Sequence, residues 1–170
     1  MKKYDKLVFI CTNNTSRSPI AEGIMKQLLG GRKLEVTSKG LVVLFEEPIN
    51  PKVVAAAERY GVHLENNMSR QLQEEEVGDR TLLLTMTEQQ KRNIYETYEN
   101  ALNVYTLNEF VGGQGDIEDL CGGEMSDYLE CFDTISTLVN LAAEKLFSEE
   151  EELQKQEIEQ LKKTDKEVEE

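Results

Sequence analysis

Short apolar runs alternate with helical patterns along this chain, and that alternation is the feature that most constrains its fold. The first run, KLVFI at 6–10, has no internal polar alternation, as expected for a strand buried on both faces. After a polar turn, Ile20, Ile24 and Leu28 recur four residues apart, which gives a helix one apolar face. The chain therefore opens as a strand, a turn and a helix.

The same alternation continues to residue 147. Further strands are predicted at 33–40, 80–86 and 101–107, further helices at 51–61, 87–99 and 126–147, and a short helix or turn at 69–78. Strands that alternate with helices at this spacing predict an α/β fold, with a four-stranded parallel sheet flanked by helices on both faces.

Composition limits the number of domains and the kinds of partner. A chain of 170 residues that is 39% hydrophobic can bury one substantial core. The net charge of −14 argues against nucleic acid and against an anionic membrane surface, since both are bound by clustered Lys and Arg. No apolar run approaches the length of a membrane span, and the N-terminal run is too brief for a signal peptide. We expect a cytoplasmic protein.

The composition changes at Ser148. Residues 148–170 hold ten acidic and four basic side chains, and their only apolar residues are Leu153, Ile158, Leu161 and Val168. We expect one domain over 1–147, followed at 148–170 by a charged extension that is helical or disordered and solvated.

The polar turn after the first strand, CTNNTSRSP at 11–19, is the stretch most suggestive of chemistry. It starts at the carboxyl end of a strand and ends at the N-terminus of a helix, where open α/β sheets hold their ligands. A loop of this kind presents successive backbone N–H groups, and the helix dipole adds positive partial charge, so it suits a phosphate-sized anion. The planar guanidinium of Arg17 can donate hydrogen bonds to two oxygens of the anion at once.

Such a loop would also keep Cys11 as a thiolate, the form that attacks phosphorus. The sequence therefore predicts a phosphate-binding loop after the first strand that hydrolyses phosphate esters without a metal or a cofactor. Residues 11–18 contain neither Gly nor Lys, so this is not the ATP-binding loop G-x4-G-K-[ST]. The alternative is a purely structural role, in which Cys11 is a small buried apolar residue. That role leaves the neighbouring polar residues unexplained.

The stretch VFICTNNTSRSPIAEGI resembles the signature of the low-molecular-weight protein tyrosine phosphatase family. Three later segments are similar to other segments of that family, in the same order: VTSKG at 36–40, SRQL at 69–72 and GDIEDLCGG at 115–123. The resemblance covers about residues 5 to 147, and it implies a phosphatase domain over 1–147. It also implies phosphorylated proteins as substrates and inorganic phosphate as a product.

The resemblance implies a role for each loop residue. Cys11 would form a cysteinyl-phosphate, Arg17 would bind the equatorial oxygens, and Asp119 would be the general acid. Asp116 is the fallback acid, or else it caps the following turn. The other residues expected to bind phosphate or support the loop are Thr12, Asn13, Asn14, Thr15, Ser16, Ser18 and Ser38, with Ser18 hydrogen-bonded to the thiolate and Asn14 bracing the loop beside Ser38.

Several positions depart from the family pattern. Asn13 stands where the family usually has Gly, which is tolerable if that position needs a positive φ. Ser16 replaces a frequent second loop cysteine, so the intraloop disulfide of many members cannot form. Leu120 and Cys121 replace the usual Pro and aromatic residue after the acid. Phe45 is expected either to supply an alternative wall for the substrate cleft or to serve in packing.

Two phosphorylated side chains are compatible with the sequence as the substrate. Phosphotyrosine is the family default, but Thr15 and the stretch CTNNTSRSP are similar to the protein-arginine-phosphatase branch, where the Thr hydroxyl favours a guanidinium leaving group. Two further alternatives are a phosphate-binding pseudo-phosphatase and an arsenate reductase. The latter needs a resolving cysteine near the nucleophile, and Ser16 removes the obvious one.

Overall fold

A computed structural model describes residues 3–64, 66–120 and 122–168. Its sheet has four parallel strands, as the sequence predicts, and their order is β2-β1-β3-β4. The strands are β1 (Lys6–Cys11), β2 (Glu35–Gly40), β3 (Thr81–Thr85) and β4 (Val104–Thr106). Since β1 is hydrogen-bonded on both sides, the residue that ends it, Cys11, lies near the middle of the sheet edge.

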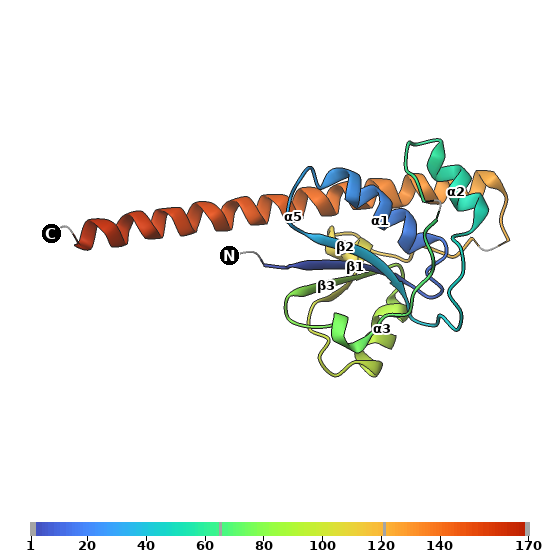
Figure 1. Ribbon diagram of the computed structural model, residues 1–170, viewed down its shortest axis with the longest axis horizontal. Coiled ribbons are helices and arrows are strands. Elements are labelled where there is room, and N and C mark those ends of the chain that lie inside the picture. The colour runs from blue at the N-terminus through green and yellow to red at the C-terminus, as the bar shows by residue number, and fades with distance from the viewer. Residues whose placement is uncertain (1–2, 65, 121, 169–170) are drawn as a thin grey trace.

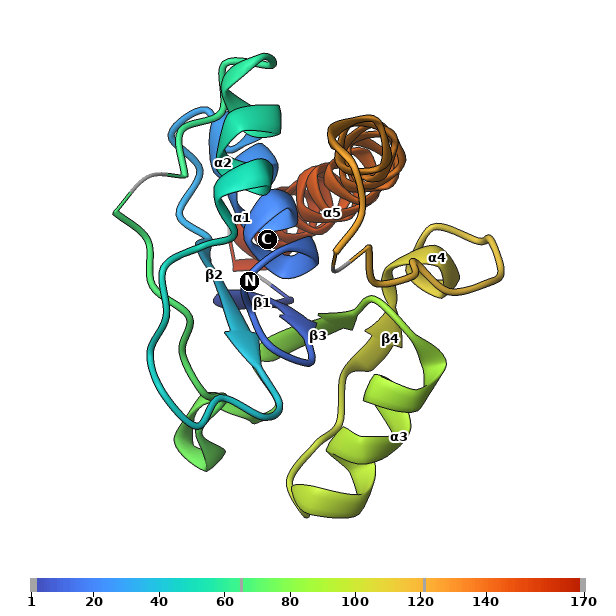
Figure 2. The ribbon, with the colours of Figure 1, turned by 90° about the vertical axis from the view of Figure 1, so that its right-hand side faces the viewer.

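The two faces of the sheet are covered by different helices. Side chains of β1 alternate between two apolar clusters, with Leu7 and Phe9 in the larger and Val8 and Ile10 in the smaller. Helices α1 (Arg17–Leu28), α2 (Pro51–Glu58) and α5 (Met125–Val168) lie on the side of the larger cluster, and α3 (Glu88–Thr97) lies on the other (Figure 2). This is the predicted arrangement of helices on both faces.

Local capping explains where the helices begin. Asn50 accepts a hydrogen bond from the Lys52 amide, and Pro51 occupies the first turn of α2. Thr87 and Gln90 form a reciprocal capping box at the start of α3. The short helix or turn predicted at 69–78 is a single 3-10 turn, η1 (Glu74–Glu76).

The strand predicted at 101–107 is shorter in the structure. Thr106 accepts a hydrogen bond from the Glu109 amide at 3.0 Å and so caps a single helical turn, α4 (Leu107–Phe110). This cap ends β4 after three residues. The prediction was wrong at this end because an apolar pattern does not distinguish a strand end from a short helix.

Helix α5 is longer than the helix predicted at 126–147. It continues without a break to Val168 and runs far past the sheet, beyond the end at which β1 begins (Figure 1). Leu146 and Phe147 pack against the larger cluster, whereas most side chains after Glu150 are exposed. Among the described residues, no helix combines the length and apolar character needed to cross a bilayer.

Candidate active site

The polar loop lies at the carboxyl edge of the sheet, between β1 and α1. Its start is packed tightly against the end of β2, because the carbonyl of Thr12 accepts the amides of Leu41 and Val42 at 2.9 and 3.0 Å. A Cβ on Gly40 would lie 2.9 Å from the Thr12 carbonyl oxygen and 2.4 Å from Val43. Only glycine therefore allows this close approach of the two segments.

A buried hydrogen-bond network surrounds the sulfur of Cys11. The Sγ of Cys11 lies 2.9 Å from the Ser18 hydroxyl, and Nδ2 of Asn14 donates to Oγ of both Ser18 and Ser38 at 2.9 Å. Oδ1 of Asn14 accepts from the Arg70 amide at 2.9 Å. Because the Ser18 oxygen already accepts from Asn14, its proton is free to be donated to the sulfur.

The left-handed residue of the loop is Asn14, with φ at 58°, and not Asn13. The sequence reasoning considered a positive φ at Asn13, and the structure does not place it there. Asn tolerates this conformation better than most residues with a Cβ. The same side chain therefore both permits the turn and ties it to β2 and to the 69–72 segment.

The backbone amides of residues 13–16 are available to an anion. Over the described ranges, they donate to no protein acceptor. Ser16 is the residue before α1, and its side chain makes no capping hydrogen bond there. The first turn of α1 adds further amides and the positive end of the helix dipole. The loop thus has the donors that a tetrahedral oxyanion requires.

Arg17 is buried, with 5% of its surface exposed, and it connects the loop to the segment that carries the candidate acid. Its Nη1 donates to the carbonyl of Ile117 at 2.8 Å. The amide of Ile117 in turn donates to the Met86 carbonyl at 2.9 Å, at the end of β3. Ile117 is therefore held from two sides, which fixes the backbone on which Asp116 and Asp119 stand.

The two candidate acids have different environments. Oδ1 of Asp116 accepts the Glu88 amide at 2.9 Å, so Asp116 caps the first turn of α3. Asp119 lies close enough to Cys131 to influence its ionisation, as do Arg17 and Cys11. Burial is the main reason that the pKa of Cys131 rises to about 11; the Arg17 charge opposes this rise, and Asp119 and Cys11 add to it. Asp119 therefore lies in the same neighbourhood as Cys11 and Arg17.

Sequence reasoning missed two residues that support the loop from outside. Gln90 is buried, accepts the Met86 and Thr87 amides, and donates to Oγ1 of Thr12 at 3.2 Å. The Asn50 amide donates to the Thr15 carbonyl at 3.0 Å. The capping box at Thr87 signals a role for Gln90 at the helix start, but it does not signal contact with Thr12.

A hollow beside the loop is formed by the 42–47 segment. It is lined by Asn13, Val42, Val43, Leu44, Phe45, Glu47 and Ser69. Phe45 is 78% exposed, so it does not serve in packing, the second of its two expected roles. After the acid, Leu120 packs against the larger apolar cluster, and Cys121 lies outside the described residues. Apolar side chains are thus available to a ligand next to the anion site.

The side chains are those of a cysteine-dependent anion site. In the part of the chain that the structure describes, no three or more His, Cys, Asp or Glu side chains are grouped to hold a metal ion. The family model for low molecular weight phosphotyrosine protein phosphatase matches residues 6–161. The chain belongs to this family. It is accordingly a cysteine-dependent protein phosphatase.

Similar proteins in this family carry two kinds of name. The chain is 31% identical over 134 residues to the low molecular weight protein-tyrosine-phosphatase PtpB of Staphylococcus haemolyticus, covering 79% of this chain and 94% of that protein. It is 35% identical over 151 residues to the protein-arginine-phosphatase of Geobacillus stearothermophilus, covering 85% and 98%. A solved structure of a YwlE arginine phosphatase mutant with a phosphorylated active-site serine superposes with a TM-score of 0.77 at 32% identity, covering 83% of this chain and 95% of that one.

Proposed function

We propose that this enzyme hydrolyses phosphorylated protein side chains through a cysteinyl-phosphate intermediate. The observation that carries the proposal is the position of the Cys11 sulfur, 2.9 Å from the Ser18 hydroxyl at the base of a loop with four amides available to an anion. The products are the dephosphorylated protein and inorganic phosphate. A cytoplasmic location, expected from the sequence, is part of this proposal.

The reaction has two steps. The Cys11 thiolate attacks phosphorus, the bond from phosphorus to the substrate side chain breaks, and Asp119 gives a proton to the leaving group. Water then attacks the cysteinyl-phosphate, Asp119 takes the proton from that water, and the S–P bond breaks to return the thiolate. The loop amides and Arg17 stabilise the three equatorial oxygens in both transition states. Ser18 donates its hydrogen bond to the sulfur when it leaves as an anion.

Phosphoarginine is the substrate class that the loop favours. Thr15 stands in the middle of the loop, with its carbonyl fixed by the Asn50 amide at 3.0 Å. A hydroxyl at this position suits a polar guanidinium, and its shape restricts an aryl group. The similar protein of G. stearothermophilus is named a protein-arginine-phosphatase.

Phosphotyrosine is the second candidate, and a separate observation favours it. The exposed ring of Phe45 lines the hollow beside Asn13, where it could stack on an aryl leaving group. The S. haemolyticus relative is named a protein-tyrosine-phosphatase. The two candidates therefore differ in which wall of the site contacts the leaving group.

Turnover of p-nitrophenyl phosphate and phenyl phosphate tests the chemistry. We expect Cys11→Ser to abolish hydrolysis of both. Asp119→Asn should slow phenyl phosphate far more than p-nitrophenyl phosphate, because nitrophenolate leaves readily without a proton. Asp116→Asn is the matched control, since its amide oxygen can still cap α3. Phosphate binding without turnover in the unaltered enzyme would instead make it a pseudo-phosphatase, and thiol-dependent arsenate reduction at a comparable rate would make it an arsenate reductase.

Paired assays on phosphoarginyl and phosphotyrosyl peptides test the substrate. Thr15→Ile should lower the ratio of phosphoarginine to phosphotyrosine turnover, whereas Thr15→Ser, which keeps the hydroxyl, should preserve more of it. A ratio unchanged by Thr15→Ile would exclude Thr15 as the selecting residue. If Phe45→Ala lowers turnover of phosphotyrosine but not of phosphoarginine, that result would support contact between the Phe45 ring and an aryl leaving group.

A further inference from the structure

Gln90 is a polar side chain on the buried face of α3. Only 3% of its surface is exposed, and Ile94, one turn later on the same face, is fully buried. An amide costs free energy to bury unless its donor and acceptor groups are hydrogen-bonded. The hydrogen bonds of Gln90 should therefore account for an amide at this position of the helix.

The capping box accounts only for the oxygen of this amide. Oε1 of Gln90 accepts the Met86 amide at 2.9 Å and the Thr87 amide at 3.0 Å. A glutamate accepts such bonds equally well, and its negative charge is favourable at a helix N-terminus. Glutamine differs by its amide nitrogen, and here Nε2 donates to Oγ1 of Thr12 at 3.2 Å. The bond to Thr12 thus distinguishes Gln90 from an ordinary capping residue.

The contacts of Gln90 reach both neighbours of the nucleophile. Thr12 directly follows Cys11, and Ile10 directly precedes it. The Met86 amide that donates to Gln90 also donates to the Ile10 carbonyl, at 3.1 Å. Gln90 therefore contacts Thr12 directly and is linked to Ile10 through one backbone amide. The start of α3 is in this way attached to the backbone on each side of the sulfur.

Residues 86–90 also hold residues 116–119, which we call the acid segment. The Met86 carbonyl accepts the Ile117 amide at 2.9 Å. The first amide of α3 donates to Oδ1 of Asp116 at 2.9 Å. Because these bonds lie just before the candidate acid in the sequence, they restrict where its carboxylate can be placed. Residues 86–90 thus bond both to the catalytic loop and to the acid segment.

The ring of contacts closes through Arg17. Nη1 of Arg17 donates to the Ile117 carbonyl at 2.8 Å, and Arg17 ends the loop that Thr12 begins. Both ends of the loop are thus connected to the acid segment, one through Gln90 and the other through Arg17. Proton transfer to a leaving group needs the two atoms within hydrogen-bond reach, so a shift of about 1 Å between the segments would slow it.

We propose that Gln90 is a positioning residue that sets the placement of Asp119 relative to the phosphoryl group that Cys11 attacks. The inference rests on the proposed function, in which Asp119 gives a proton to the leaving group. Loss of the Gln90 bonds lets the acid segment shift against the loop, while the loop amides that bind phosphate stay in place. The step that needs the acid should therefore slow, and phosphate binding should not weaken.

Substitution Gln90→Met tests the proposal, because methionine is an unbranched side chain of similar size without these hydrogen bonds. The value of kcat/KM reports the first step alone, formation of the cysteinyl-phosphate. We expect kcat/KM to fall about tenfold or more for phenyl phosphate and at most about twofold for p-nitrophenyl phosphate, whose leaving group departs without a proton. Inhibition by inorganic phosphate should change by less than about twofold. Weaker phosphate inhibition with equal losses on both esters would show a disordered loop and overturn the proposal.

The substitution Asp119→Asn provides a double-mutant cycle. If Gln90 acts through Asp119, adding Gln90→Met to Asp119→Asn should change kcat/KM for phenyl phosphate by less than about twofold, because no acid is left to position. A full additional loss in the double variant would overturn the proposal, as would an unchanged ratio of the two esters in Gln90→Met. Failure of the proposed function is distinct, because the unaltered enzyme would then hydrolyse neither ester, or Asp119→Asn would not lower the ratio.

Thr12→Val removes the same hydrogen bond from its other end and leaves the cap of α3 intact. It therefore keeps the proposal testable if Gln90→Met does not fold. We expect a lower ratio of phenyl phosphate to p-nitrophenyl phosphate kcat/KM, with phosphate inhibition retained. A ratio equal to that of the unaltered enzyme would show that the bond between Gln90 and Thr12 does not position the acid.

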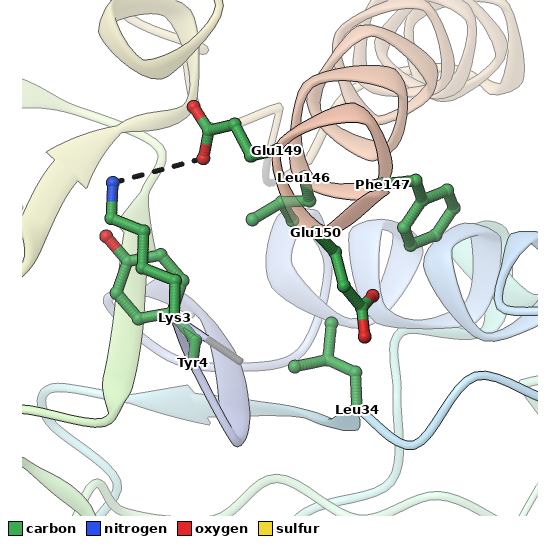
Figure 3. A pocket seen from close by; sticks show the side chains of 7 residues that line it. All are labelled: Lys3, Tyr4, Leu34, Leu146, Phe147, Glu149 and Glu150. Atoms are coloured by element: carbon green, nitrogen blue, oxygen red, sulfur yellow. Dashed lines mark ion pairs between the residues drawn. The ribbon is translucent and has the colours of Figure 1, made fainter. Parts of the chain in front are cut away.

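Two control variants should leave this ratio unchanged. Gln89→Met replaces the exposed glutamine of the same turn, whose Nε2 donates to Asn93 within α3. Lys3→Ala removes the 3.9 Å ion pair between Lys3, just before β1, and Glu149 in α5 (Figure 3). The catalytic loop follows the other end of β1. A ratio that falls as far in either control as in Gln90→Met would overturn the assignment to Gln90.

Discussion

Asn14 joins three segments of the chain at the residue scale. It donates to Ser18 in α1 and to Ser38 in β2, and it accepts from the Arg70 amide, while its own backbone is left-handed. The side chain and the backbone conformation therefore contribute separately to holding the loop. The two contributions can be measured by two substitutions.

Replacement of Asn14 by Ala should lower the free energy of unfolding by roughly 2–4 kcal/mol, because it removes the buried hydrogen bonds to Ser18 and Ser38 and strains the left-handed turn. Asn14→Gly loses the same hydrogen bonds but accepts the positive φ, so it should cost about 1 kcal/mol less than Asn14→Ala. Denaturant unfolding of both variants measures the difference. Equal stabilities would show that the backbone conformation at residue 14 carries no cost.

Cys131 should be inert at the pH where the enzyme works. With a pKa of about 11, only about one Cys131 thiol in a thousand is ionised at pH 8, and the side chain is buried. We expect iodoacetamide to label Cys11 on the native protein and to spare Cys131, with inorganic phosphate protecting Cys11. Peptide mass spectrometry reads out both sites. Labelling of Cys131 as fast as Cys11 would contradict the raised pKa of Cys131.

At the scale of elements, Glu76 in η1 connects the first two strands. Its carboxylate lies 3.1 Å from Nζ of Lys6 in β1 and 3.2 Å from Nζ of Lys39 in β2. Burial alone would raise the pKa of Glu76, but the hydrogen bonds from the Gln73 amide, Lys6 and Lys39 outweigh it and hold the pKa below its ordinary value of 4.5.

The stabilisation by Glu76 should therefore depend on pH with a definite sign. The lowered folded pKa means that the contribution is fully present above about pH 4.5, the value expected in the unfolded chain, and is lost as the pH falls through the folded pKa. Glu76→Gln should unfold more readily than the unaltered protein at pH 7, and the gap should close in acid. A gap that stays constant from pH 7 to pH 3 would exclude the ionised carboxylate as its source.

The elements themselves were largely predictable, whereas the contacts between distant elements were not. Apolar periodicity locates strands and helices because that signal is local. The bond from Gln90 to Thr12 spans 78 residues, and the bond from Arg17 to Ile117 spans 100. Only the assembled sheet edge brings such pairs together, so no local pattern encodes them.

At the scale of the whole molecule, the candidate site lies at the carboxyl edge of the parallel sheet. Helix α5 extends past the opposite edge of the sheet. The resemblance to the family predicts the candidate loop residues, because the family's motifs occur in the same order in this sequence. It did not reveal the continuous helix, since a charged stretch with few apolar residues is compatible with a helix or with disorder. The division at residue 147 stays a proposal that truncation can test.

A chain ending at residue 147 should keep its fold and its turnover. The last residues that pack on the core are Leu146 and Phe147. The truncation removes the Lys3–Glu149 and Arg32–Glu151 pairs, both 3.9 Å long and partly exposed, and such pairs contribute about 0–1 kcal/mol each. Thermal unfolding and hydrolysis of p-nitrophenyl phosphate measure the outcome. Loss of turnover on truncation would make the extension part of the catalytic domain.

The central claim is that the loop after β1 holds a sulfur nucleophile beneath a bound phosphoryl group. Rapid quenching of the enzyme with p-nitrophenyl phosphate, followed by mass spectrometry, tests it most directly. We predict one added phosphoryl group on Cys11 that accumulates further in Asp119→Ala, where water is not activated, and that is absent after Cys11→Ala. Steady turnover by Cys11→Ala, or a phosphoryl group found on another residue, would contradict the account.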